Sequence, residues 1–186
     1  MPYQATIAAV RQALTDIFAA VDGWFDRSKE LRRFRPPSGG WSIDQILEHV
    51  TLTNHFLLLI IRRWTAKAVR KARRGEVVSE GESELTRLDL IGERGSFAWV
   101  RPEHMEPTGV PTPAEVRERM RGQVAECLEL LAQLRHGEGA LCKVRMSVNG
   151  LGKIDLYQWL YFLAQHARRH LQQLQEIERR FREPGR

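Results

Sequence analysis

The chain has 186 residues, of which 42% are hydrophobic and 28% are charged, and its formal net charge is +6. This length and composition predict a single globular domain over residues 1–186. The densest apolar run, residues 56–61, is too short to span a bilayer. No basic-then-apolar layout typical of a signal peptide opens the sequence, so we expect a cytoplasmic protein without membrane partners. The positive charge favours anionic partners in general.

The first half of the chain predicts two long helices. Apolar residues recur at steps of three and four from Tyr3 to Arg33, which is typical of one amphipathic helix. Prolines and glycines at 36–40 end it. Ser42 and Gln45 form a capping box that opens a second helix, which extends to about Arg74. Its end carries a basic run without any acidic residue: Arg62, Arg63, Lys67, Arg70, Lys71, Arg73 and Arg74.

An irregular segment follows at 76–111 and separates the second helix from the third. A connection of this length in a small domain favours a crossover or a functional cover over a flexible loop, and residues 97–100 (Phe-Ala-Trp-Val) are apolar enough to require burial. Thr112, Pro113 and Glu115 then open a third helix. Residues 143–148 alternate in polarity before an Asn-Gly turn, so a short hairpin is predicted after that helix.

The last predicted helix spans Asp155 to Phe181 and ends in a basic tail at 179–186. Its apolar seam consists of Leu156, Leu160, Leu163, Ala167, His170, Leu174, Ile177 and Phe181. Four amphipathic helices with little strand signal predict an all-α four-helix bundle. The short first link makes helices one and two antiparallel neighbours. The long link after helix two permits a crossover, so helices two and three can run parallel.

Three of the six histidines are predicted to face the core. His166 and His170 are one turn apart on the last helix, and His49 lies on an inward strip of the second. His55 is about 120° further around that helix and should not share their site. Each histidine alone is better explained as a hydrogen-bonded residue of the core. An i, i+4 pair with a third inward histidine favours a metal site with an open position.

Two blocks carry a resemblance to a known family. Residues 41–49, Trp-Ser-Ile-Asp-Gln-Ile-Leu-Glu-His, and residues 166–173, His-Ala-Arg-Arg-His-Leu-Gln-Gln, resemble the DinB-like superfamily of metalloenzymes. That superfamily includes bacillithiol transferases and mycothiol-dependent isomerases. The resemblance implies an up-down-down-up bundle and a divalent metal on His49, His166 and His170. It also implies homodimers as a common state. No acidic residue occurs at 50–69, so a carboxylate just after His49 is absent and the catalytic residues stay unassigned.

The leading hypothesis is a transferase that activates a low-molecular-weight thiol, with a small-molecule substrate, at a site for zinc, nickel or iron. Alternatives are a metal-dependent hydrolase of the same family, a site in which the metal only joins two helices, and a non-catalytic bundle that binds nucleic acid or another partner through its basic run. The last ranks lower, because no nucleic-acid motif accompanies the run. Arg168 and Arg169 are expected to be mainly solvated, and binding an anionic cofactor is their less favoured role.

Overall fold

The computed structural model of the chain describes residues 3–37, 39–96 and 102–183. Four long helices dominate it, joined by short helices and one hairpin. The helices are α1 (Gln4–Asp22), α2 (Lys29–Arg33), α3 (Ile43–Arg73), α4 (Asp89–Gly92), α5 (Pro113–Gln133) and α6 (Leu156–Arg182), and the strands are β1 (Lys143–Met146) and β2 (Gly152–Asp155). None of the described helices is both long and apolar enough to pass through a membrane.

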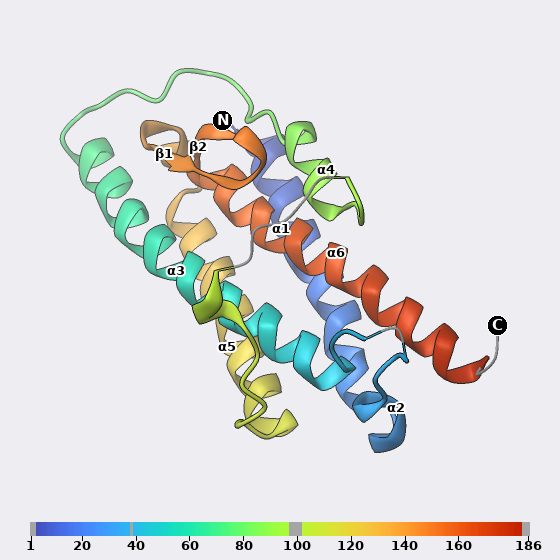
Figure 1. The fold of residues 1–186 in the computed structure, drawn as a ribbon. Coiled ribbons are helices and arrows are strands. Elements are labelled where there is room, and N and C mark those ends of the chain that lie inside the picture. The colour runs from blue at the N-terminus through green and yellow to red at the C-terminus, as the bar shows by residue number, and fades with distance from the viewer. Residues whose placement is uncertain (1–2, 38, 97–101, 184–186) are drawn as a thin grey trace.

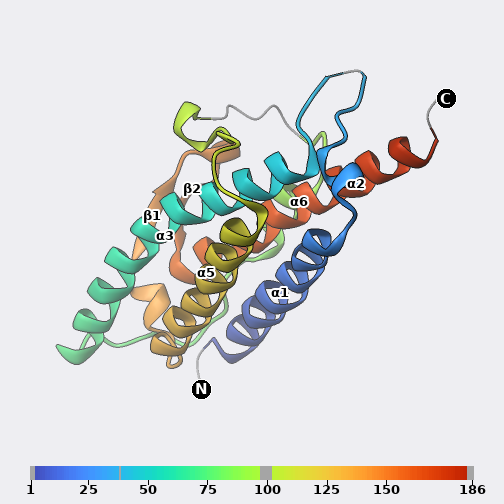
Figure 2. The same ribbon diagram turned by 90° about the horizontal axis from the view of Figure 1, so that it is seen from below.

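The four long helices form the predicted up-down-down-up bundle. Helices α1 and α6 run in one direction and α3 and α5 run in the other (Figures 1 and 2). Each of α1 and α3 packs against both α5 and α6. The segment between α3 and α5 returns along the bundle, which makes it a crossover; within it α4 packs on α6, and the 3₁₀ turn Glu103–Met105 packs on α3. Residues 97–100, for which burial was predicted, lie outside the described residues.

Local capping explains where the three later helices begin. Ser42 with Gln45, Thr112 with Glu115, and Asp155 with Gln158 each form a reciprocal capping box, in which two otherwise unsatisfied backbone N–H groups find acceptors. The hairpin is also confirmed, with β1 antiparallel to β2 and the Asn-Gly sequence between them. The predicted seam of α6 is buried as far as Ile177, whereas Phe181 is 37% exposed and contacts the edge of the Phe34 ring.

The predicted single helix from Tyr3 to Arg33 is wrong. Helix α1 ends at Asp22, a 3₁₀ turn follows at Gly23–Asp26, and α2 starts separately after Ser28. Glycine weakens a helix interior, and the Ser28 side chain accepts a hydrogen bond from the Leu31 N–H, which favours a new start. Trp24 and Phe25 are consecutive in sequence and both buried, which the tighter turn allows.

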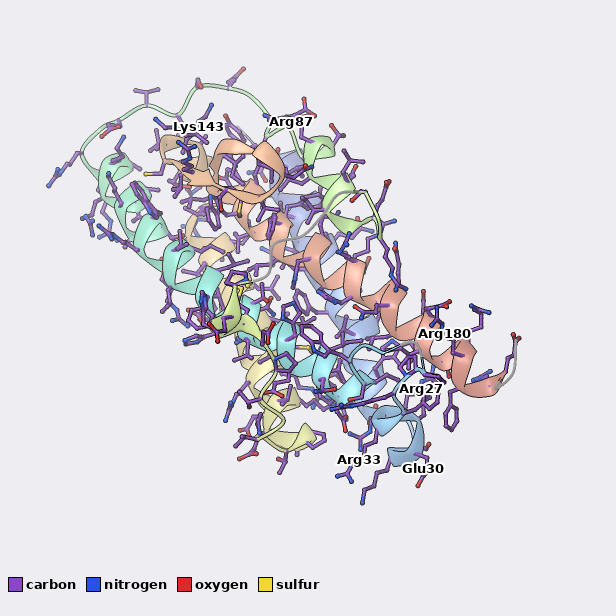
Figure 3. All side chains as sticks on the ribbon, in the orientation of Figure 1. Arg27, Glu30, Arg33, Arg87, Lys143 and Arg180 are labelled. Atoms are coloured by element: carbon purple, nitrogen blue, oxygen red, sulfur yellow. The ribbon has the colours of Figure 1, made fainter. Side chains whose placement is uncertain are left out.

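Charged side chains cover the outer surface. Arg27, Glu30, Arg33 and Arg180 project near α2 and the end of α6, while Arg87 and Lys143 lie toward the opposite end (Figure 3). The described part of the predicted basic tail continues α6 to Arg182, and its arginines pair within the helix: Arg179 and Arg180 contact Glu176, and Arg182 contacts Glu178. Exposed pairs of this kind add little stability.

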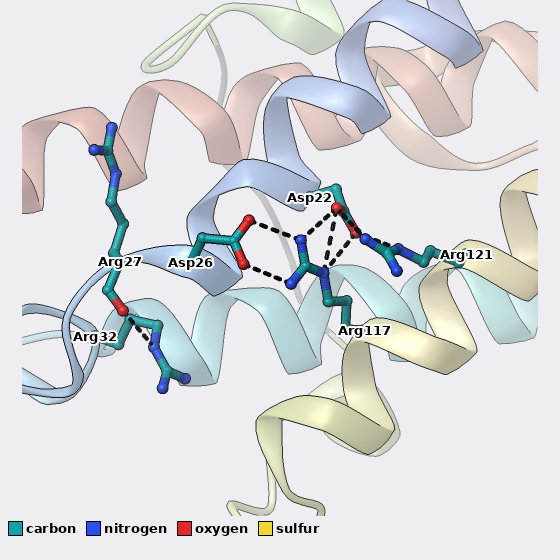
Figure 4. A network of polar contacts seen from close by, with 6 residues as sticks. All are labelled: Asp22, Asp26, Arg27, Arg32, Arg117 and Arg121. Atoms are coloured by element: carbon teal, nitrogen blue, oxygen red, sulfur yellow. Dashed lines mark hydrogen bonds and ion pairs between the residues drawn. The ribbon is translucent and has the colours of Figure 1, made fainter.

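One ion-pair cluster joins the end of α1 to α5. Arg117 contacts Asp22 at 2.8 Å and Asp26 at 2.6 Å, and Arg121 contacts Asp22 at 2.7 Å (Figure 4). Asp22 therefore accepts hydrogen bonds from two guanidinium groups, and these bonds hold its pKa far below the usual range. The cluster fixes the break after α1 against the first turns of α5.

We expect Asp22→Asn to lower the free energy of unfolding at pH 7 by about 1–2 kcal/mol. The folded-state pKa of Asp22 is depressed, so its contribution is complete above the unfolded pKa of about 4 and is lost as the pH falls toward the folded pKa. The gap between wild type and variant should therefore narrow from pH 5 to pH 2 in urea titrations. The exposed Asp16→Asn on the same helix is the control, and an equal, pH-independent effect of both variants would contradict this role.

Candidate metal centre

Helices α3 and α6 bring three histidines together in the middle of the bundle. His49, His166 and His170 each offer a ring nitrogen, and these nitrogens all lie within 4.8 Å of one another. The His166 and His170 rings are 4.6 Å apart between centroids, and the His49 ring is 5.3 Å and 4.8 Å from them. Their exposed fractions are only 5%, 3% and 9%, in sequence order. The predicted convergence is confirmed, and His55 is exposed and outside the cluster.

The backbone explains this convergence. His166 and His170 lie one turn apart on one face of α6, where residues four apart are neighbours. Helix α3 packs against that face, so a single inward residue, His49, completes the group. Capping boxes at Ser42 and Asp155 fix the residues at which the two helices begin.

Hydrogen bonds orient two of the imidazoles. His49 Nδ1 lies 2.7 Å from the Met105 carbonyl oxygen, and His170 Nδ1 lies 3.1 Å from Oε1 of Gln173. Both oxygens are acceptors, so each Nδ1 donates a hydrogen and each Nε2 keeps its lone pair. Nε2 of His170 is 3.2 Å from Nε2 of His166. Outer contacts of this type fix the tautomer and ring orientation of metal-ligating histidines.

The electrostatics of the cluster favour a neutral His166 ring. Burial lowers the pKa of His166 well below its usual value, and the neighbouring His170 and His49 lower it further. Neutral imidazole is the form that binds a metal ion. Three imidazoles within reach of one ion are a suitable ligand set for zinc, nickel or iron.

The nearest carboxylate in sequence has a different task. Glu48 is buried beside His49, but it accepts hydrogen bonds from the backbone N–H groups of Thr108 and Gly109, both at 2.8 Å, and from the Thr108 hydroxyl. It therefore anchors the crossover to α3.

A cavity of about 570 Å³ opens beside the histidines. Its walls come from α3, α6, the hairpin and the crossover. The lining residues are Gly40, Trp41, His49, Thr53, Leu57, Ile60, Pro102, Met105, Arg145, Met146, Ser147, Val148, Trp159, Phe162, His166, Arg169, His170 and Gln173. The Trp41 ring lies 4.9 Å from that of His49. A largely apolar cavity with a few convergent polar groups is typical of small-molecule sites.

Several of these residues were missed by sequence reasoning. Arg168 is exposed as expected, but Arg169 is half-buried, lines the cavity and donates to the Glu93 carbonyl at 2.6 Å. Gln173 stands three residues after His170, a spacing at which side chains meet on a helix, so its contact was open to prediction. The Met105 carbonyl and Arg145 carry no such local signal, because distant segments bring them to the site.

Comparison with known proteins agrees with this architecture. The family model of the DinB superfamily matches residues 4–174. The chain belongs to the DinB superfamily. A search of curated proteins and a search of solved structures returned no match. Membership fits both the helical bundle and the three-histidine group of this DinB-superfamily chain.

We expect Gln173→Leu to weaken divalent-metal affinity by about 10- to 100-fold, because His170 loses the acceptor that fixes its tautomer. The exposed Gln175→Leu two residues later is the matched control and should leave affinity unchanged. Competition with a chromogenic chelator measures the metal affinity of both variants. Wild-type affinity in Gln173→Leu would show that this contact does not orient a ligand.

Proposed function

We propose that this chain is a divalent-metal-dependent transferase that activates a low-molecular-weight thiol at His49, His166 and His170. One observation carries the proposal: three buried imidazoles, within 4.8 Å of one another through their ring nitrogens, line a cavity large enough for a small molecule. The resemblance to a superfamily that includes bacillithiol transferases supports a low-molecular-weight thiol as the group that the metal activates. The reaction would form a bond between sulfur and an electrophilic carbon, with release of a leaving group.

The three histidines would hold the ion through nitrogen and leave coordination positions facing the cavity. A bound divalent metal supplies a Lewis acid that lowers the pKa of a thiol until the thiolate predominates at neutral pH. Met105 and Gln173 would keep Nε2 of His49 and His170 directed at the ion. Apolar side chains around the cavity exclude water, which favours thiolate attack over hydrolysis.

The lining of the cavity supports the transferase over the alternatives. Hydrolysis benefits from a general base that activates water, and no Asp or Glu occurs among the described residues that line the cavity. A metal that only joined two helices would need no adjoining cavity. The nucleic-acid alternative is weakened because part of the basic run is engaged elsewhere: Arg62 pairs with Glu126, and Lys71 pairs with Glu76 at 2.7 Å.

The test is thiol-dependent turnover of a chromogenic aryl halide by metal-loaded protein, with bacillithiol, mycothiol, glutathione and coenzyme A as thiols. We expect at least one thiol to be consumed, and the rate to fall about 100-fold or more in His166→Ala and after chelation. His55→Ala, on α3 outside the cluster, is the control. Equal rates in wild type and His166→Ala would contradict the proposal. Metal-dependent ester hydrolysis without thiol would favour the hydrolase.

A further inference from the structure

The charge of the cavity is one-sided. Arg145 from β1 and Arg169 from α6 line it, and no Asp or Glu does so among the described residues. Arg169 also donates a hydrogen bond to the Glu93 carbonyl, which holds its guanidinium beside the cavity. A divalent ion on the histidines would add further positive charge. The potential inside this cavity therefore favours an anionic ligand.

The two ends of the cavity differ in chemistry. His49 lies near the beginning of α3 and the two other histidines lie in the middle of α6. The hairpin lies near the beginning of α6 (Figure 1), where Trp159 Nε1 donates to the Val144 carbonyl at 3.4 Å. Trp159 and His166 are separated by about 10 Å along the helix axis, at 1.5 Å per residue. The rest of the lining is largely apolar and includes Leu57, Ile60 and Phe162.

Arg145 at the hairpin end is suited to bind an anion. It is exposed, so it marks the rim of the cavity, and its guanidinium forms no ion pair or hydrogen bond with any of the described residues. Its cross-strand partner is Lys153, another cation. Like charges that face each other across a hairpin are destabilising. An anion bound at this rim would therefore reduce the repulsion between Arg145 and Lys153. Guanidinium also matches the planar, bidentate geometry of a carboxylate.

We propose that Arg145 binds the carboxylate of an elongated ligand whose apolar body lies along Leu57, Ile60 and Phe162 and whose other end reaches the three histidines. The substrate class is then an electrophile that carries an apolar chain and a terminal acid. That this ligand is a substrate rests on the proposed transferase, but its binding by Arg145 does not. The apolar wall supplies affinity, and Arg145 supplies the preference for an acid over a neutral molecule.

The test compares octanoate with octanamide, which share shape and differ in charge, by calorimetry on the full-length chain as purified and after chelation. Octanoate should bind about three- to fivefold more tightly than octanamide, the upper range for an exposed ion pair, and high salt should reduce this preference. Arg145→Gln should abolish the preference and leave octanamide affinity unchanged. Arg87→Gln removes the same charge from an exposed residue that does not line the cavity, and should keep the preference.

Ile60→Trp fills the apolar wall and should weaken both ligands, which places them in the cavity. The inference is overturned if neither ligand binds, if octanoate has no advantage, or if Arg145→Gln keeps that advantage. A preference present only in the metal-containing protein would mean that the acid ligates the metal, and it would also overturn the role of Arg145. Since the decisive comparison needs neither metal nor turnover, its failure is distinguishable from failure of the proposed transferase.

Discussion

Packing of α3 against α6 is the constraint on which the site depends, because it buries three imidazoles that the bundle must keep neutral and oriented. A buried polar group without a partner costs free energy, so rings in these positions require acceptors of their own. The acceptor for His49 is the Met105 carbonyl, which belongs to the crossover. The acceptor for His170 is the Gln173 side chain, which lies on the next turn of α6. The crossover thus completes the polar environment of the core as well as linking α3 to α5.

The same crossover is held in place by a buried charge. Glu48 accepts three hydrogen bonds from Thr108 and Gly109, next to the histidine that Met105 orients. Two consecutive residues of α3, Glu48 and His49, therefore hold the crossover at residues 108–109 and at Met105. The carboxylate next to His49 in sequence, that of Glu48, is therefore engaged in hydrogen bonds with the crossover. Among the described residues, the cavity is lined by apolar, uncharged polar and cationic side chains and the three histidines.

Much of this was accessible from sequence, for reasons that are local. Capping boxes at Ser42, Thr112 and Asp155 fixed helix starts, and helical spacing placed the three histidines on inward faces. The prediction of one helix from Tyr3 to Arg33 failed at Gly23. The apolar spacing continues across this residue and indicates an unbroken helix, whereas the structure has a break there that ion pairs to α5 stabilise. Spacing also could not reveal partners 56 residues apart, such as His49 and Met105, since only the path of the crossover brings them together. Arg169 was misjudged because α6 is covered there by Glu93 and its neighbours, which helical phase alone does not show.

The central claim is that His49, His166 and His170 form one divalent-metal site, and metal content measured by mass spectrometry tests it most directly. Untagged wild type should carry, or take up after reloading, about one equivalent of zinc, nickel or iron per chain. His166→Ala should lose it and His55→Ala should keep it. Wild-type protein that stays metal-free after reloading, or equal metal content in wild type and His166→Ala, would contradict the account and leave the three histidines as packing residues of the core.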